Sequence, residues 1–418
     1  MRHIKYIFTI YFLFLSVSNL LAQKIKLEEV LTNIETDNPQ LKMYDADIRS
    51  MDAAAKGAKS WMPPQVTTGF FMTPYTTSMW KPNEMNFGMG NYMLGVQQMI
   101  PNQSKLKADY NYMNAMSSVA VENKNYTINQ LNALAKTNFY QWIILDKKLI
   151  VANNNLLLLD YMIKSMEIRY QYNKAKLSTY YKAKSQYSNL QSMIVMLKND
   201  ITQKKIMLNT LMARDKNTDF DIDTNYQLKD FDFTKLDTTL LAKNRSDVKA
   251  IDKTIVLNQL KIETEKKQLL PEFGVKYDHM FTFGEQPQMF SLMLMVTIPF
   301  APWSSKMNKA NINSFQIKNE SLNWQKQMIL NEASGMVNGM NTEFKNVKKQ
   351  YEITTNNIIP SLKKNYDTAI IAWQNNTGDL FVVLDAWEAS NMAQMDALDK
   401  LQSILNAQVE IEKQLETK

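Results

Sequence analysis

The sequence predicts a mostly α-helical protein in which long coiled-coil hairpins are joined to strands of a membrane β-barrel. Three observations support this prediction. Strand entries marked by Pro64 and Pro271 lie 207 residues apart, so the pattern occurs twice. Four segments alternate apolar and polar residues with a period of two, and a long heptad pattern follows each pair of segments. The spacing is too long for a solenoid repeat and indicates an internal duplication.

The first 22 residues have the pattern of a secretory signal peptide. Arg2 and Lys5 precede an apolar core at residues 7–21, and Ala22 precedes the expected mature start at Gln23. No later segment has the ~20 uninterrupted apolar residues of a membrane-spanning helix. The mature chain is therefore expected to be exported and to have no transmembrane helix.

Composition excludes several classes of chemistry. The chain contains no cysteine, which excludes disulfides, thiolate chemistry and a lipid-modified N-terminal cysteine. Only His279 remains after signal removal, so metal or triad chemistry based on imidazole is nearly excluded. The mature chain has 46 basic and 41 acidic side chains, and the excess is spread along the sequence. Without a basic stripe, no nucleic-acid partner is expected.

The predicted strands have one apolar and one more polar face. They cover residues 65–73, 87–100, 272–281 and 288–298. In the last of them, the apolar face carries Phe290, Leu292, Leu294, Val296 and Ile298, and the other face carries Met289, Ser291, Met293, Met295 and Thr297. This division suits a barrel wall with lipid outside and water inside. The alternative is a pair of hairpins packed on a soluble core.

The helical segments argue against that alternative. A heptad seam runs for 40 residues from Leu131 to Tyr170, with Asn138 as its only polar member, which predicts a coiled coil. The helical stretch 104–170 would extend ~100 Å, too far for a compact globule of this size. The seam resumes over residues 177–211, so the two segments are predicted to form a helical hairpin.

The second half repeats this order. We expect a first repeat at residues 23–214, with its hairpin at 104–213, and a second at 238–418, with its hairpin at 305–416. A connector rich in Asp, Asn and Thr, at 215–237, separates them and is expected to lie against the helices. Because about eight strands are the usual minimum for a barrel, four strands per chain imply a homo-oligomer.

With this order of elements, the chain resembles the TolC-like outer-membrane efflux family over essentially the whole mature sequence. The most specific matches are the opening Leu27-Glu28-Glu29-Val30, the segment Asn38-Pro39-Gln40, the strand entries at Pro63-Pro64 and Pro271, and the two hairpin tips. The resemblance implies a homotrimer with a twelve-stranded barrel in outer-membrane lipid and a helical tunnel (α-barrel) across the periplasm of a Gram-negative bacterium. It also implies docking on a periplasmic adaptor (membrane fusion) protein that connects to an inner-membrane pump of the RND or ABC type.

The resemblance singles out the hairpin tips as the adaptor-docking sites. The first tip contributes Tyr170, Asn173, Lys176, Leu177 and Ser178, and the second contributes Trp373, Asn376, Gly378, Asp379 and Leu380. Asparagine stands at 173 and 376 where the family has glycine, and it is the next-best residue for a left-handed turn. The first tip also resembles the heavy-metal, RND-associated branch. The alternative is that both tips are ordinary turns without a partner.

The family closes its periplasmic end with acidic rings, and Asp385 matches one ring position. Val382 occupies the other acidic position, so the sequence departs from the two-ring gate of the family. The alternative for Asp385 is an ordinary solvated carboxylate at the tip. The strand–helix junctions are expected at Pro64, Pro101, Pro271 and Pro299.

The 28 methionines allow two interpretations. The strand pattern places Met89, Met93, Met99, Met289, Met293 and Met295 on the lumen side. Thioethers are ligands for Cu(I) and, by analogy, Ag(I), which makes Met289, Met293 and Met295 candidate metal ligands. Methionine is also an adaptable packing residue, and filling gaps is the favoured interpretation.

No catalytic motif is visible, so the chain is not expected to be an enzyme or to need a cofactor. The predicted function is a passive exit duct for substrates expelled by an inner-membrane pump. One alternative is the duct of a type I protein secretion system, which has the same architecture. An alternative of another class is a trimeric coiled-coil structural or adhesive surface protein. The sequence does not identify the exported substrate.

Overall fold

The computed structural model describes residues 24–84, 86–172, 176–229, 231, 238–283 and 286–416. The predicted signal peptide therefore lies outside the described residues. The described residues form two compact units: one lies within 24–42, 125–245 and 330–416, and the other lies within 43–124 and 246–329. Each unit draws segments from both predicted repeats, so the units cut across the division expected from sequence.

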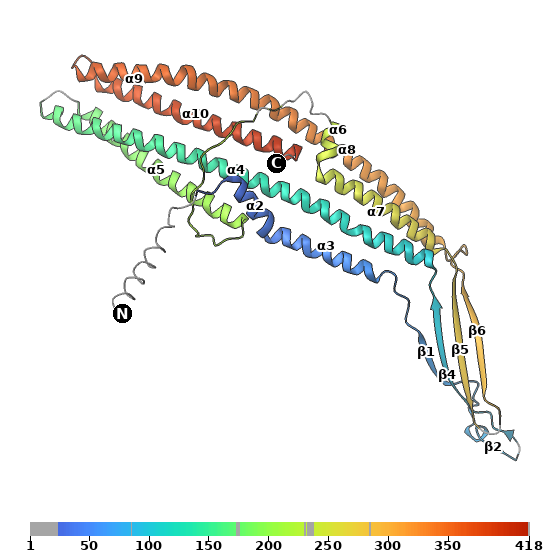
Figure 1. The fold of residues 1–418 in the computed structure, drawn as a ribbon. Helices are drawn as coiled ribbons and strands as arrows, with labels where there is room; N and C mark the ends of the chain where they lie inside the picture. The colour runs from blue at the N-terminus through green and yellow to red at the C-terminus, as the bar shows by residue number, and fades with distance from the viewer. Residues whose placement is uncertain are drawn as a thin grey trace, which may run out of the picture. The chain divides into compact units, whose positions relative to one another are not determined.

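The first unit is built from long helices. The described helices that contribute to it are α2 (Leu27–Asp37), α4 (Gln103–Gln171), α5 (Leu177–Leu211), α6 (Thr238–Asn244), α8 (Lys306–Ile353), α9 (Ile359–Gln374) and α10 (Leu380–Leu415). The hairpins α4–α5 and α9–α10 lie side by side in Figure 1. The predicted helical hairpins are thus present, with ends within a few residues of the expected ones. Among described residues, no helix is long and apolar enough to cross a membrane.

The second hairpin contains an irregularity that the first does not. A π-helical turn, η3 (Thr354–Ile358), separates α8 from α9. Pro360 follows in the first turn of α9. Proline cannot donate to the preceding helical turn, and its ring crowds the carbonyl four residues earlier. The widened turn accommodates the proline and lets the helical path continue.

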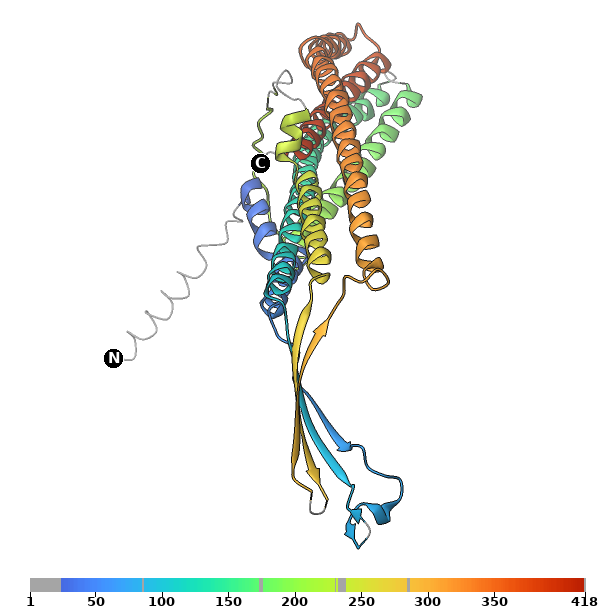
Figure 2. The ribbon, with the colours of Figure 1, turned by 90° about the vertical axis from the view of Figure 1, so that its right-hand side faces the viewer.

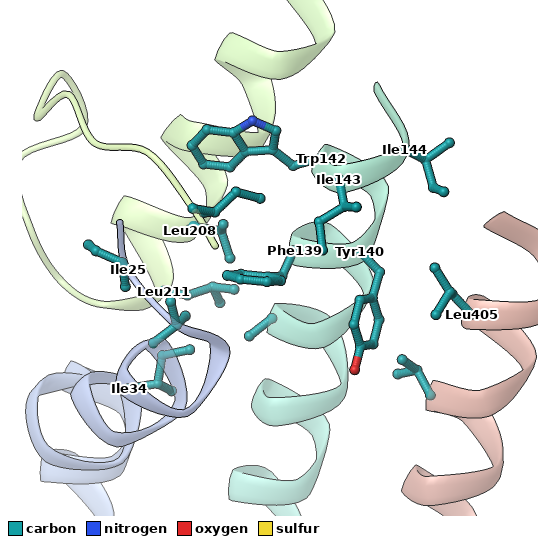
Figure 3. Packing of buried hydrophobic residues seen from close by; sticks show 14 of the residues in the cluster. Ile25, Ile34, Phe139, Tyr140, Trp142, Ile143, Ile144, Leu208, Leu211 and Leu405 are labelled. Atoms are coloured by element: carbon teal, nitrogen blue, oxygen red, sulfur yellow. The ribbon is translucent and has the colours of Figure 1, made fainter. Parts of the chain in front are cut away.

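Most residues of the predicted heptad seam lie in or against the core of this unit, with buried neighbours such as Phe139 that the seam did not include, whereas Tyr170 is exposed. Phe139, Trp142 and Leu208 are almost fully buried, and Figure 3 shows them between α2, α4 and α5. The Trp142 ring meets Phe220 of the connector edge-on, at 5.2 Å between centroids. Further along the hairpins, a second cluster surrounds Met162, Met166 and Trp387. Burial of these large side chains, at roughly 1.5–3 kcal/mol each, outweighs the modest helix propensity of the aromatic ones.

A buried charge network holds the connector to the helices. Glu412 of α10 is 3% exposed and pairs with Lys136 of α4 at 2.5 Å and with Lys229 of the connector at 2.8 Å. The side-chain oxygen of Gln408 accepts a bond from the backbone amide of Lys229 at 3.0 Å. The connector therefore packs along this unit, as its polar sequence predicted.

The helix breaks of the two halves make equivalent contacts. Asn38, between α2 and α3 (Pro39–Gly57), donates to the carbonyl of Leu211 at the end of α5, at 2.9 Å. Arg245, between α6 and α7 (Ser246–Gln268), donates to the backbone carbonyl of Gln414 at the end of α10 at 3.4 Å, and to the side-chain oxygen of the same residue at 2.5 Å. Each break residue thus satisfies carbonyls that a helix end leaves without an intrahelical partner.

The second unit contains the sheet. Its strands are β1 (Gln65–Phe70), β4 (Asn91–Ile100), β5 (Glu272–Thr282) and β6 (Met289–Thr297), all antiparallel in the order β1-β4-β5-β6. A short turn η1 (Thr77–Met79) and a two-residue pair, β2 (Pro82–Asn83) and β3 (Asn86–Phe87), lie between β1 and β4. The twist of the four strands is visible in Figure 2.

The register confirms the predicted faces. Phe273 pairs with Val296, Val275 with Leu294, and Tyr277 with Leu292, so one face is mostly apolar. We call this the apolar face. Across the described strands it carries Val66, Phe70, Tyr92, Leu94, Val96, Ile100, Phe273, Val275, Tyr277, Phe281, Phe290, Leu292, Leu294 and Val296, together with the polar residues Thr68, Gln98 and His279.

The opposite side is the polar face. Its described residues are Gln65, Thr67, Gly69, Asn91, Met93, Gly95, Gln97, Met99, Glu272, Gly274, Lys276, Asp278, Met280, Thr282, Met289, Ser291, Met293, Met295 and Thr297.

The prediction of one strand over residues 87–100 is wrong at its start. Gly88 has φ +76°, and a Cβ there would lie 2.7 Å from the carbonyl oxygen of Phe283. At Gly90, a Cβ would meet the Phe283 ring at 2.4 Å. These close approaches bend the chain, so β4 begins only at Asn91. Met89 accordingly lies in the connection and is not on the polar face of the sheet.

Candidate functional site

The two hairpin tips are joined by polar contacts within the first unit. Arg169, in the last turn of α4, donates to the carbonyl of Trp373 at 3.1 Å and to the side-chain oxygen of Asn376 at 2.9 Å. It also lies over the Trp373 ring, with its Cζ 4.4 Å from the centroid. Arginine combines a planar donor fork with a stacking surface, so this one side chain binds the end of α9 in two ways.

The predicted left-handed asparagine is present in the second tip. Asn376 has φ +60°, and its amide donates to the carbonyl of Trp373 at 3.1 Å. The amide of Gly378 bonds to the carbonyl of Ala372 at 3.0 Å, and a Cβ at Gly378 would lie 3.0 Å from the Ala372 Cβ. A larger residue there would press against α9. Asn173, its counterpart in the first tip, lies outside the described residues.

Asp379 begins α10 and links the tips a second time. Its Oδ1 accepts the Phe381 amide at 3.0 Å, which is an N-cap, and its Oδ2 accepts from Lys176 of the first tip at 3.1 Å. These two hydrogen bonds hold the pKa of Asp379 below its usual range, and the bond from the Phe381 amide has the larger effect. A charged carboxylate is favoured at a helix N-terminus, where amides without partners point outward.

The remaining tip residues divide by burial. Trp373 and Leu380 are buried among the second cluster of α4, α5, α9 and α10, so they support the tip from inside. Tyr170, Leu177 and Ser178 are exposed. The structure therefore leaves these three, with Lys176 and Asp379, on the surface that a partner would meet.

Asp385 is exposed on α10, and Val382, one turn earlier, is exposed as well. The two residues share one face of the helix because they are three positions apart. Their neighbours Val383 and Leu384 are buried. This placement aims Asp385 away from its own hairpin core.

The four predicted proline junctions lie next to the strand ends. Pro64 and Pro271 directly precede β1 and β5, while Pro101 directly follows β4 and Pro299 lies two residues beyond β6. One junction is further tied by an ion pair of 2.7 Å between Lys105 of α4 and Glu272 of β5.

The register regroups the candidate metal ligands. Met289, Met293 and Met295 lie along one strand, and each pairs with a different position of β5. Met289 is opposite Met280, which in turn is opposite Met93. The sequence reading overlooked Met280, although period two places it on the same face as Asp278. It also overlooked Arg169, which no sequence motif marked.

The comparisons with known proteins agree with this architecture. Residues 30–214 match the sequence model of the family described as "Outer membrane efflux protein". Comparison with curated proteins gives no match.

Solved outer-membrane channels share the fold. A crystal structure of CusC has 13% identity and a TM-score of 0.75, covering 95% of this chain and 93% of CusC. The CmeC outer membrane channel of Campylobacter jejuni has 13% identity and a TM-score of 0.72, covering 93% of this chain and 85% of CmeC. The open-state MtrE channel of Neisseria gonorrhoeae has 13% identity and a TM-score of 0.72, covering 94% of this chain and 89% of MtrE.

Proposed function

We propose that the chain, which matches the TolC-like outer membrane efflux family over residues 30–214, is the exit duct of a tripartite efflux system. In this role, three copies form a passive channel for substrates expelled by an inner-membrane pump. The family match confirms the predicted outer-membrane location. Because members of this family are channels, it also confirms that the chain is not an enzyme.

The apolar face of the sheet carries the membrane part of the proposal. Phe290, Leu292 and Leu294 are 68%, 65% and 83% exposed. Soluble proteins rarely expose an apolar surface of this kind to water, so it marks contact with lipid or protein. Aromatic residues lie at both ends of it: Trp61 and Trp303 near the strand–helix junctions, and a cluster of Phe70, Trp80 and Phe283 at the opposite end. Apolar bands between aromatic girdles are typical of outer-membrane barrels.

Four strands cannot close a barrel, whereas three copies supply twelve, which is within the range of outer-membrane barrels. The helices support the same assembly because apolar side chains such as Leu157, Val195 and Ile371 are exposed on the hairpins. We infer that these side chains face neighbouring copies in a helical tunnel. The equivalent contacts of Asn38 and Arg245 support an origin of the two halves by duplication.

At the tips, the exposed side chains Tyr170, Lys176, Leu177 and Ser178 would dock the hairpins of a periplasmic adaptor, which joins the duct to a pump of the RND or ABC type. Asn173 belongs to the same proposed surface. Asp385 would form the gate, since three carboxylates brought together on the tunnel axis repel one another and attract cations. Val382 replaces a second acidic ring with an apolar one.

The test is single-channel conductance of the purified protein in a planar bilayer. We expect a small, cation-selective conductance that rises or loses selectivity in Asp385→Ala. The control is Asp367→Ala, an exposed carboxylate on α9, which should leave the conductance unchanged. A protein that neither conducts nor fractionates with the outer membrane would instead support a coiled-coil surface protein. A type I secretion duct would conduct as well, and neighbouring genes for an ABC exporter would favour it.

A further inference from the structure

Three methionines from three different strands form a row across the polar face. Met93 of β4 is directly opposite Met280 of β5, and Met280 is directly opposite Met289 of β6. Directly opposite residues of an antiparallel pair have Cβ atoms about 4.5–5.5 Å apart and point to the same face. The three thioethers therefore start from adjacent positions although they are up to 196 residues apart in sequence.

The position on β1 that would continue the row has no side chain. Gly69 of β1 is opposite Met93, and a Cβ built on Gly69 meets nothing within 4 Å. Met289 is 40% exposed. Methionine has three rotatable bonds, so these side chains can turn their sulfur atoms towards one point without moving the backbone. An ion has access to the row from the open side.

Packing does not account for this row. A methionine that fills a core gap is buried among apolar neighbours. Here the next row of the same face contains Gly95, Asp278 and Ser291, and Asp278 pairs with Lys276 at 3.1 Å and accepts from Ser291 at 3.1 Å. Met289 is exposed, and Met93 and Met280 are half-buried beside the Asp278–Lys276 ion pair, so the three thioethers lie on a polar surface and not in an apolar core.

We propose that Met93, Met280 and Met289 form a binding site for soft monovalent metal ions, Cu(I) or Ag(I), on the polar face of the sheet. Thioethers select these ions over hard cations because both partners are polarisable. The binding itself depends only on the sheet. Its place on the path of exported ions rests on the proposed function, in which the polar face lines the channel.

The experiment is calorimetric titration of the full-length, detergent-purified protein with silver nitrate in chloride-free buffer. The test variant is Met93→Leu, Met280→Leu and Met289→Leu together, since Leu keeps the volume and removes the sulfur. The control is Met196→Leu, Met336→Leu and Met392→Leu together, three exposed methionines of α5, α8 and α10.

We expect the native protein and the control to bind one silver ion per chain that the row variant does not bind. The proposal is overturned if the row variant binds as much silver as the native protein, or if the control loses as much. Conductance of the row variant separates the two proposals. A conducting pore without altered silver binding removes the metal site alone, whereas silver binding to a protein that forms no pore removes the duct alone.

Discussion

The guanidinium of Arg169 lies over the indole ring of Trp373 and donates to the carbonyl oxygen of the same residue, 204 positions away in sequence. With the ion pair between Lys176 and Asp379, it ties the two hairpins of one chain together at their tips. If opening of a duct separates these hairpins, both contacts must break. A separate substitution can remove each of these two contacts.

Replacement of Arg169 by alanine is expected to loosen the tips. Hydrogen bonds to a charged group contribute about 1.5–3 kcal/mol, and the stacking on Trp373 is lost as well. Since the chain has no cysteine, spin labels can be placed on cysteines introduced at Gln171 and Gln374. Pulsed electron resonance should show a longer and broader distance distribution in Arg169→Ala. Arg169→Lys, which keeps the charge without the fork, should fall between; identical distributions in all three proteins would contradict this role.

Asp379→Ala should destabilise the first turn of α10 by roughly 0.5–2 kcal/mol, because the N-cap is lost. Asp379→Asn keeps an acceptor for the Phe381 amide and loses only the exposed ion pair, so its effect should be about 0–1 kcal/mol. Hydrogen exchange of residues 380–384 measures both.

The same carboxylate predicts a pH dependence at the tip. Because the pKa of Asp379 is lowered in the folded protein, its stabilisation is present above the ordinary carboxyl pKa. The stabilisation is lost as pH falls through the lowered pKa. The protection factor of the Phe381 amide should fall at low pH in the native protein and should stay constant in Asp379→Asn. An equal pH dependence in both proteins would show that another group is responsible.

Glu412→Ala should be strongly destabilising, by about 3–5 kcal/mol, because it leaves the buried Lys136 without its partner. A double variant, Lys136→Met with Glu412→Leu, should recover most of that loss, since no charge remains buried. Denaturant unfolding of the three proteins tests this, and a double variant as unstable as Glu412→Ala would rule the argument out.

Tyr140 predicts a loss of stability at alkaline pH. Burial, and then the nearby Glu412 and Glu28, raise the pKa of Tyr140 to about 12. The raised pKa favours folding fully below pH ~10, the pKa of an unperturbed tyrosine, and this contribution is lost between pH ~10 and ~12. The loss is on the order of 2–3 kcal/mol, at 1.36 kcal/mol per pKa unit. It should appear as the difference in unfolding free energy between the native protein and Tyr140→Phe at pH 9 and 11.5.

Gly95→Ala should disturb the sheet, because a Cβ there would lie 2.1 Å from Oδ1 of Asp278 and 2.6 Å from Oγ1 of Thr67. Overpacking of this kind costs typically 1–3 kcal/mol. Gly335→Ala, in α8, meets nothing within 4 Å and should be neutral or stabilising. Heat-dependent gel migration of the two variants compares the stability of the proposed barrel, and equal midpoints would argue against close packing at Gly95.

Much of the fold follows from local periodicity. The heptads that begin at Leu131 predicted that Trp142, Ala152 and Leu159 would be buried, and they are. Alternation predicted both sheet faces correctly, because side chains of a strand can point to only two sides. The start of β4 was missed because it depends on the close contacts of Gly88 and Gly90 with Phe283, a residue from the other half of the chain.

The sequence by itself determined the element types, their order and the position of both tips, since these depend on neighbours a few residues apart. Only the tertiary structure decided that Arg169 reaches Trp373, that Glu412 pairs with Lys136 and Lys229, and that Met93, Met280 and Met289 form one row. Such pairings depend on strand register and on which helix faces meet. Both are set by the packing of segments about 200 residues apart, and no local pattern encodes them.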